Sequence, residues 1–166
     1  MIGARYEQSV QTHPFSELIG FVELKTKLHT GPSVKYFRNL HTVQAFIHGS
    51  LIATPTHLQA EHALFAAIKG WDILIEIPVT ETLQEAEKMV KIIITQTGVA
   101  SLVDHLRCYH KNSHNLKHFI QNDEIVAPVT AILIWAIRKP DAYFKGNWRS
   151  TGGIPVMINL VHDVDV

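Results

Sequence analysis

Short alternating segments follow helical patterns along this chain, and this order constrains the fold more than any other feature. Segment 18–29 alternates apolar and polar side chains, which is the period-two pattern of a half-buried strand. Two later segments show the same alternation, 71–77 and 154–164. Helical patterns lie between the first two strands, so the order is not a regular strand-helix-strand alternation. We therefore expect an α+β fold, a mostly antiparallel sheet of about four strands packed against four or five helices.

The expected helices have recognisable ends. Apolar residues recur every three or four positions in the predicted helices, which cover 33–49, 54–70 and 82–98. Thr54 and Pro55 are typical of a helix start, and Thr82 with Glu85 resembles a capping box. Glycines stand where the helical patterns stop.

The second part of the chain gives weaker patterns. Segment 101–109 predicts a continued helix, 111–113 a turn, and 115–121 a short helix or a turn. Segment 125–137 is apolar on every side, and its β-branched residues favour a buried central strand.

Length and composition favour one ordinary domain. The chain has 166 residues, of which 46% are hydrophobic, enough to bury a core without disulfides. We expect residues 1–17 to form an N-terminal arm and residues 18–166 to form a single α+β domain. The longest apolar stretch, 127–137, falls short of the roughly 20 residues that a membrane span needs. The single Cys108 and the absence of a signal peptide favour an intracellular, cytoplasmic location.

Charge favours self-association over coating of nucleic acid. Fifteen basic and fifteen acidic side chains cancel. The charge is unevenly placed, because 21–70 is net positive, 71–96 net negative, and 138–149 net positive again. Blocks of opposite sign would let copies of the chain attract each other, although an ordinary mixed surface also explains them.

One aromatic and basic segment is the best candidate contact loop. It consists of Tyr143, Phe144, Lys145, Trp148 and Arg149. Such residues stack on bases and hold phosphates, and they also dominate protein-binding hot spots. The alternative is that the aromatic side chains fold back onto the core.

A histidine-rich segment is the candidate metal site. Its possible zinc ligands are His105, Cys108, His110, His114 and His118. The alternative is a polar helix beside a buried Cys108 that behaves as a small hydrophobic residue. A Cys108 nucleophile would need a base from elsewhere in the fold. His57 and His62 lie five residues apart and therefore face different sides of their helix, one exposed and one at the core edge.

No sequence motif indicates a cofactor. G-x-G-x-x-G, G-x-x-x-x-G-K-[ST] and G-x-S-x-G are all absent. We therefore expect no bound cofactor and no catalytic residue, and the absence of these motifs favours a non-enzymatic protein.

The first third of the chain resembles rhabdovirus matrix proteins. The matching order is a strand at 21–29, a turn at Gly31-Pro32, and two helices at 33–48 and 55–70. This resemblance implies a structural protein that self-associates, condenses a nucleocapsid and meets a membrane.

A second resemblance is to the small tRNA-binding subunit of the KEOPS complex. It rests on residues 43–46, 51–53 and 57–64, followed in order by 115–117 and 132–137. It requires an insertion of about twenty residues around 73–94. This resemblance implies an RNA-binding accessory subunit.

These features together favour a matrix-like assembly protein. Its expected partners are further copies of itself, a nucleoprotein or another protein, with a membrane surface and RNA as further candidates, and it would be associated with a virion. The alternatives are an RNA-binding accessory subunit and a small histidine-based or zinc enzyme.

Overall fold

The computed structural model describes residues 2–23 and 34–125, together with positions 132, 134, 136, 138 and 140. The chain divides into two compact units, Met1–Leu102 and Val103–Val166. Within the described ranges, no helix has the length and apolar character that crossing a membrane requires. The sequence-based division into an arm and one domain stays a prediction.

The first unit opens with a helix and a pair of parallel strands. Helix α1 covers Ile2–Thr12, where we expected an arm without regular structure. Strand β1, Gly20–Val22, pairs in parallel with β2, Lys35–Phe37. The rings of Phe21 and Tyr36 stack across this pair with their centroids 5.6 Å apart. The predicted strand at 18–29 is thus present as β1, while residues 24–33 lie outside the described residues.

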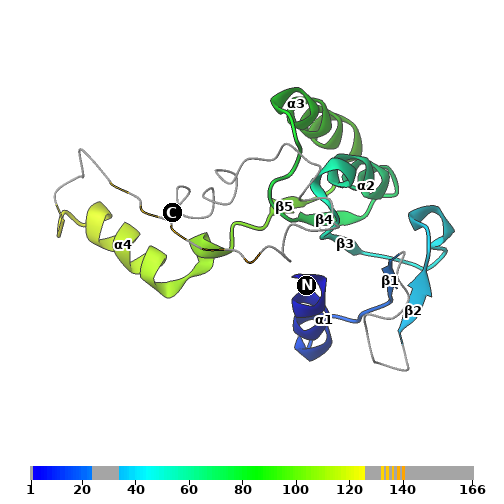
Figure 1. Ribbon diagram of the computed structural model, residues 1–166, viewed down its shortest axis with the longest axis horizontal. Helices are drawn as coiled ribbons and strands as arrows, with labels where there is room; N and C mark the ends of the chain where they lie inside the picture. Colours follow the sequence, from blue (N-terminus) through cyan, green and yellow to red (C-terminus); the bar gives the residue numbers. More distant parts are fainter. Residues whose placement is uncertain are drawn as a thin grey trace. The chain divides into compact units, whose positions relative to one another are not determined.

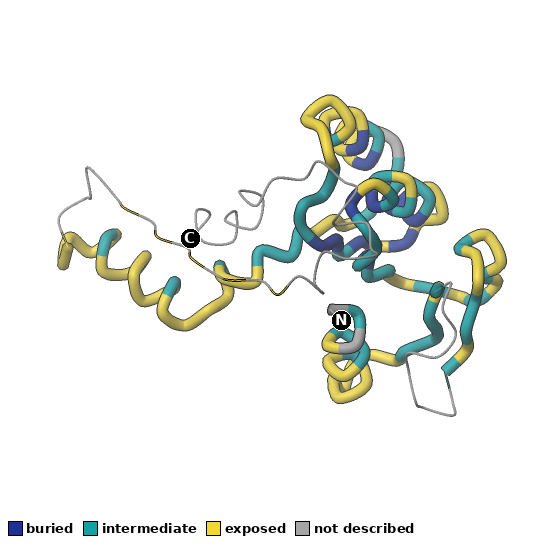
Figure 2. Tube along the Cα trace, viewed as in Figure 1, coloured by how far each residue is buried: buried dark blue, intermediate teal, exposed yellow. Residues whose placement is uncertain are grey.

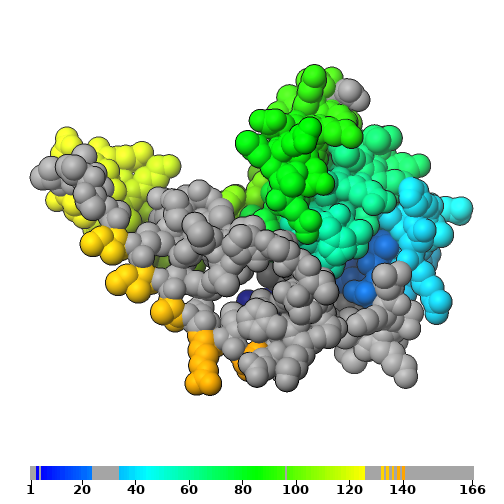
Figure 3. Space-filling view, turned by 45° about the horizontal axis from the view of Figure 1, so that its top comes forward, coloured from blue at the N-terminus to red at the C-terminus, as the bar shows by residue number. Residues whose placement is uncertain are grey.

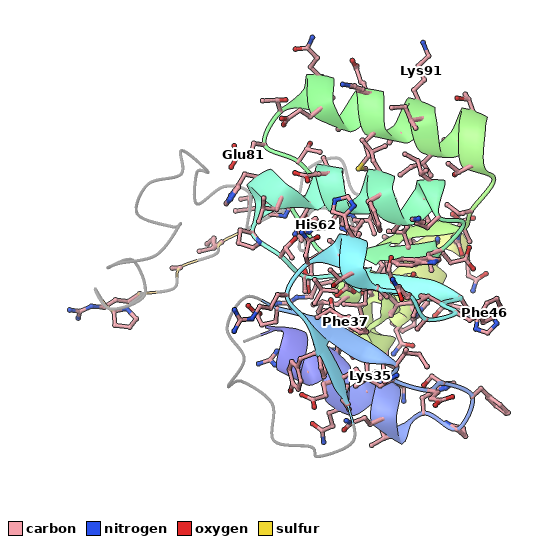
Figure 4. The ribbon with its side chains drawn as sticks, turned by 90° about the vertical axis from the view of Figure 1, so that its right-hand side faces the viewer. Lys35, Phe37, Phe46, His62, Glu81 and Lys91 are labelled. Atoms are coloured by element: carbon pink, nitrogen blue, oxygen red, sulfur yellow. The ribbon has the colours of Figure 1, made fainter. Side chains whose placement is uncertain are left out.

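A three-stranded parallel sheet forms the rest of the first unit. Its strands are β3 (Gly49–Ile52), β4 (Asp72–Ile75) and β5 (Ser101–Val103), in that order. Helix α2, Thr56–Ile68, connects β3 to β4, and α3, Leu83–Ile92, lies between β4 and β5. Figures 1 and 4 show α2 and α3 on one side of this sheet and α1 on the other. These elements make one complete βαβαβ unit.

The start signals of α2 and α3 correctly predicted both helices. Thr82 caps α3, because its hydroxyl accepts from the Glu85 amide at 3.3 Å and donates to the Glu85 carboxylate at 3.0 Å. Helix α2 begins directly after Pro55, whose fixed φ suits a helix start. Gly70 and Gly98 follow the helices with φ of 75° and 67°, a conformation that glycine adopts without strain. The predicted strand at 71–77 is confirmed as β4.

The buried core belongs to the three-stranded sheet and its two helices (Figure 2). Isoleucines of β3 and β4 face the helices, and α2 covers them with its alanine face. The buried hydrophobic residues are Ile52, Ala63, Ala66, Ala67, Trp71, Ile73, Ile75, Met89 and Ile93. Alanine methyl groups let α2 lie close to the strands, since larger side chains would hold the helix away. Figure 3 shows α2 and α3 as one continuous surface over this core.

The predicted antiparallel α+β fold is wrong, because all described strand pairs are parallel. The error began at 33–49, where we predicted a helix. That segment contains β2, a 3-10 turn at Leu40–Thr42, and the start of β3. The strand β3 is a four-residue sequence, Gly-Ser-Leu-Ile, too short to show a period. Without it, the regular alternation of strands and helices was hidden.

The second unit contains one described α-helix. The chain makes a 3-10 turn at Leu106–Tyr109 and then forms α4, Lys111–Gln121. The predicted helix at 101–109 is therefore wrong over β5, and the predicted turn at 111–113 is the first turn of α4. Of the helix or turn expected at 115–121, the helix is confirmed. The predicted strand at 154–164 and most of that at 125–137 lie outside the described residues.

Candidate functional site

The carboxyl ends of β3 and β4 bring polar side chains to one edge of the sheet. The two strands pair in parallel with Gly49 opposite Asp72 and Ile52 opposite Ile75. Thr54 follows β3 by two residues, and Glu76 follows β4 directly. Because parallel strands end at the same edge, these residues of distant sequence lie at one rim, where open α/β sheets bind their ligands.

Thr54 organises the β3 side of this rim. The Gln59 side-chain amide donates to the Thr54 carbonyl at 2.9 Å, and the Thr54 hydroxyl lies 3.2 Å from Nδ1 of His62. Both partners come from the first turns of α2, which therefore fix the strand-to-helix turn. Figure 4 shows His62 on the side of α2 that faces the strands.

Gln59 has one unsatisfied buried acceptor. The residue is only 2% exposed, and its Oε1 has no hydrogen-bond partner among the described residues. The Thr54 carbonyl can only accept a hydrogen bond, so the Gln59 side-chain atom that contacts it must be the nitrogen Nε2. The other atom is therefore the oxygen Oε1. A buried acceptor without a donor costs about 1–3 kcal/mol. A donor that reached this position would therefore be bound favourably.

Glu76 joins the β4 rim to α1. Its side chain is buried, with 6% of the residue exposed. One carboxylate oxygen accepts from the Tyr6 hydroxyl of α1, and the other accepts from the Ile77 amide at 3.2 Å. This contact spans 70 positions of sequence and ties the first helix to the end of the fourth strand.

His62 is neutral at this rim. Burial lowers the pKa of His62 below its usual 6.5, and this effect exceeds the opposing influence of the nearby Glu61 carboxylate. The neutral ring both donates and accepts, which suits its contact with the Thr54 hydroxyl. The expectation that one of the two histidines is exposed and the other lies at the core edge is confirmed, because His57 is exposed and His62 is half-buried.

The predicted contact loop, which consists of Tyr143, Phe144, Lys145, Trp148 and Arg149, lies outside the described residues. It stays a prediction.

The predicted metal ligands occupy structural positions instead of a shared site. His110 caps α4 by accepting from the Asn112 amide at 3.2 Å. His118 lies 2.8 Å from the Asn122 side chain and 3.7 Å from the Glu124 carboxylate. His105 and Cys108 belong to the preceding turn, and His114 lies in α4. Over the described ranges, no three histidine, cysteine or acidic residues gather as a metal site would require.

Sequence reasoning missed Tyr6, Gln59 and Glu76. Tyr6 and Glu76 are placed by a contact that spans 70 positions, and Gln59 by a contact with the Thr54 carbonyl that no sequence motif marks. One signal was present, since both Thr54-Pro55 and Glu76-Ile77-Pro78 follow an apolar run directly. Polar residues just after buried strands indicate the ligand-binding rim of a parallel sheet.

A parallel sheet with helices on both sides and a polar rim at its carboxyl ends is the architecture of doubly wound α/β proteins, which bind their ligands at that rim. The comparisons with known proteins give the same result. A model of the GFO/IDH/MocA group, described as an oxidoreductase family with an NAD-binding Rossmann fold, matches residues 1–105. The chain belongs to this family.

Individual relatives are distant. A 4-carboxy-2-hydroxymuconate-6-semialdehyde dehydrogenase from a Sphingobium species is 24% identical over 116 residues, covering 70% of this chain and 36% of the relative. The structure of myo-inositol 2-dehydrogenase from Lactobacillus plantarum gives a TM-score of 0.67 at 19% identity, covering 75% of this chain and 39% of that one. The WlbA dehydrogenase from Bordetella pertussis, solved with NADH and UDP-GlcNAcA, gives 0.51 at 22% identity over 54% and 26%. The chain thus spans about two fifths or less of the length of these relatives.

Family membership overturns the functional expectation. The chain is neither a rhabdovirus matrix protein nor a KEOPS subunit, and the prediction of a non-enzymatic assembly protein is wrong. The matrix-protein resemblance rested on the helix expected at 33–49, which the structure replaces with β2, a 3-10 turn and the start of β3. The alternative of a histidine-based or zinc enzyme is also unsupported, because the family is defined by nicotinamide chemistry.

The described residues fit part of a dinucleotide. Gly3 lies in the first turn of α1, and Glu23 stands twenty positions later, directly after β1. In dinucleotide-binding domains, a glycine at the helix start lets the helix pack closely on the sheet, and an acid about twenty residues on accepts from the ribose 2′-hydroxyl of NAD. The buried Gln59 amide and the Thr54 turn are the polar groups at the rim of β3. The full G-x-G-x-x-G turn, which meets the pyrophosphate, is absent from these 166 residues.

Proposed function

We propose that this chain serves as the cofactor-binding part of a nicotinamide-dependent oxidoreductase. The observation that carries this proposal is the complete βαβαβ unit from β3 to β5, with Thr54, Gln59 and Glu76 at its carboxyl rim. A doubly wound domain contains two such mononucleotide-binding halves. Family membership makes the ligand a nicotinamide dinucleotide.

The two nucleotides of the cofactor would divide between the two halves. Glu23, after β1, would hold the adenosine ribose by accepting from its 2′-hydroxyl. The rim at β3 and β4 would hold the nicotinamide nucleotide, whose carboxamide offers the donor that Gln59 Oε1 lacks. When bound, the nicotinamide ring carries the hydride that an oxidoreductase transfers.

Direct binding tests the rim. We expect nicotinamide mononucleotide to bind the chain more tightly than adenosine monophosphate, as measured by isothermal titration calorimetry. Gln59→Leu should weaken binding of nicotinamide mononucleotide about tenfold or more, because it removes a buried polar contact. The matched control is Gln84→Leu, since Gln84 is exposed on α3, away from the rim. Equal binding of both mononucleotides, or equal loss in both variants, would contradict the assignment.

The acid after β1 predicts the choice of dinucleotide. The Glu23 carboxylate accepts from a hydroxyl but repels a 2′-phosphate, so we expect NAD to bind more tightly than NADP. Glu23→Gln should reduce this preference, whereas Glu87→Gln, an exposed position on α3, should leave it unchanged. Tighter binding of NADP than of NAD by the unaltered chain would contradict the assignment of Glu23 to the adenosine ribose.

A further inference from the structure

The outer side of helix α3 carries large apolar side chains that are exposed. Leu83 is 75% exposed, Val90 45% and Ile94 72%. Leu83 and Val90 lie in α3, and Ile94 lies in a π-helical turn, Ile93–Thr97, that continues the helix. Spacings of seven and four residues place all three on one side of the helix, so they form one apolar stripe. Figure 3 shows α3, coloured green, at the surface of the first unit.

The core of the first unit uses a different side of α3. Met89 and Ile93 are buried, and α3 packs against α2. At 3.6 residues per turn, these two positions lie roughly a quarter of a turn around the helix from the stripe. A helix that covers a core needs one apolar side, so the fold of the unit does not account for the stripe. Adjoining exposed apolar side chains mark surfaces that bind another molecule.

The charges beside the stripe change sign along α3. Glu81, Glu85 and Glu87 are exposed in its first half, and Lys88 and Lys91 are exposed in its second half. Figure 4 shows Lys91 pointing away from α2. A second α3 that runs antiparallel brings the acidic half of one helix beside the basic half of the other, whereas a parallel one brings like charges together. Antiparallel helices also place opposite ends of their macrodipoles side by side.

The stripe and the charges share one centre of symmetry. The midpoint of positions 83 and 94 is 88.5, and the midpoint of positions 87 and 91 is 89. A two-fold axis at this point places Leu83 of one copy beside Ile94 of the other, and Glu87 of one copy beside Lys91 of the other. The two midpoints differ by half a residue, about 0.8 Å of helix, so apolar and charged contacts form in the same register. A contact between identical surfaces requires such self-complementarity.

We infer that α3 is a docking surface for a second copy of this chain, which binds antiparallel about a two-fold axis near the middle of the helix. The contact buries Leu83, Val90 and Ile94 of both copies, and Glu87 of each copy pairs with Lys91 of the other. A stripe of three side chains covers less than the about 800 Å² per partner of a stable interface. The dimer is therefore reversible, with a dissociation constant above about 1 µM. This inference stands whether or not the chain binds a nicotinamide cofactor.

Sedimentation equilibrium of the full chain tests for the dimer. Over protein concentrations from about 5 µM to about 1 mM, the weight-average mass should rise from that of one chain toward that of two. Added salt should weaken the dimer, because it screens the ion pairs between the two helices. A constant monomer mass over this range would overturn the inference and leave α3 to a different partner.

Ile94→Asp and Ile68→Asp are matched variants. Ile68 is 73% exposed, nearly the same as Ile94, and lies at the end of α2, outside the stripe. Ile94→Asp should raise the dissociation constant at least about tenfold, because it places a carboxylate in an apolar contact. Ile68→Asp should leave the constant unchanged, and urea unfolding checks that both variants fold. Equal effects of the two substitutions, or no effect of either, would overturn the inference.

Charge exchange tests the antiparallel register. Glu87→Lys places a lysine beside Lys91 of the second copy, and Lys91→Glu places two glutamates together, so each should weaken the dimer about fivefold. The double variant, with both substitutions, should associate as the unaltered chain does. In a parallel pair each position faces its own copy, so neither single substitution would weaken the contact. Single variants with unchanged association, or a double variant that stays weak, would overturn the inference.

Cofactor binding gives an independent readout. The rim residues Thr54 and Gln59 contact each other beside the carboxyl end of β3, on other elements than the stripe. Ile94→Asp should therefore leave the binding of nicotinamide mononucleotide unchanged while the dimer is lost. Loss of both together would show that the substitution disturbs the fold and would overturn the assignment of Ile94 to the docking surface. A dimer of a chain that binds no nicotinamide would leave this inference standing and remove the proposed function.

Discussion

The two halves of the first unit differ in how completely they are built. The half from β3 to β5 has three strands, two covering helices and every buried hydrophobic residue of the described ranges, from Ile52 to Ile93. The half from α1 to β2 has two three-residue strands and none of these buried residues. Both halves consist of parallel strands and α-helices. Among the described residues, the core therefore forms where helices cover the three-stranded parallel sheet, and the two-stranded pair contributes none of it.

The largest expected effect comes from removing core volume in the complete half. Ile73 of β4 is 3% exposed, so Ile73→Ala should lower the free energy of unfolding by about 3 kcal/mol. Val22→Ala in the incomplete half should cost less than about 1 kcal/mol, because Val22 is partly exposed. Urea unfolding measures both. Similar losses would mean that the two halves share one core.

The Tyr6–Glu76 contact connects the halves, and its removal should be the next largest effect. Tyr6→Phe takes a donor from a buried carboxylate and should cost about 1–3 kcal/mol. A double-mutant cycle with Glu76→Gln should show strong coupling, which urea unfolding of the four proteins determines. Additive losses would show that the contact does not tie the halves together.

Gly3→Ala should act in the opposite direction. Since no described residue lies within 4 Å of a Cβ at Gly3, alanine should stabilise α1 by about 0.5–1 kcal/mol, seen as a higher unfolding midpoint. Gly70→Ala is the matched control and should destabilise, because Gly70 has a φ of 75°. A destabilising Gly3→Ala would show that a strand already packs against α1.

The smallest expected effect is the pH dependence of the free energy of unfolding that comes from His62, on helix α2 of the half from β3 to β5. The folded pKa of His62 is lowered, so the neutral ring stabilises the fold fully above the unfolded pKa of 6.5. As the pH falls below 6.5, the unfolded chain gains a proton that the folded chain refuses, and stability decreases. His62→Asn should flatten this acid limb in unfolding experiments between pH 7.5 and 5, about the range in which histidine titrates. The exposed His57→Asn should not.

Local signals predicted the helices α2 and α3 far better than the strands β2 and β3. Thr54-Pro55, Gly70 and the Thr82–Glu85 capping box define α2 and α3 through contacts within a few residues. By contrast, β2 and β3 are held by partners distant in sequence, and the helical spacing between 33 and 49 is coincidental. Strand direction cannot be read from one sequence, because parallel and antiparallel pairs use the same alternation.

The candidate site shows the same limit. Thr54 was recognised only as a helix start, and His62 only as one of two histidines on different sides of the same helix. Gln59 and Tyr6 gain their roles from the Thr54 carbonyl and the Glu76 carboxylate, contacts that arise only after the chain has folded. The rim residues that follow β3 and β4 were visible in the sequence, but their meaning depends on knowing that those strands are parallel.

Trp71 gives the complete half an optical reporter. Trp71 is 8% exposed, and its ring packs edge-on against the ring of Phe65, with the two centroids 6.0 Å apart. An indole shielded from water emits at shorter wavelength than one in water, so its emission follows the packing of α2 on β4. In the double variant Trp135→Phe and Trp148→Phe, the remaining tryptophan fluorescence would come from Trp71 alone. A shift of its emission to longer wavelength before the rest of the chain unfolds would show that this half unfolds first.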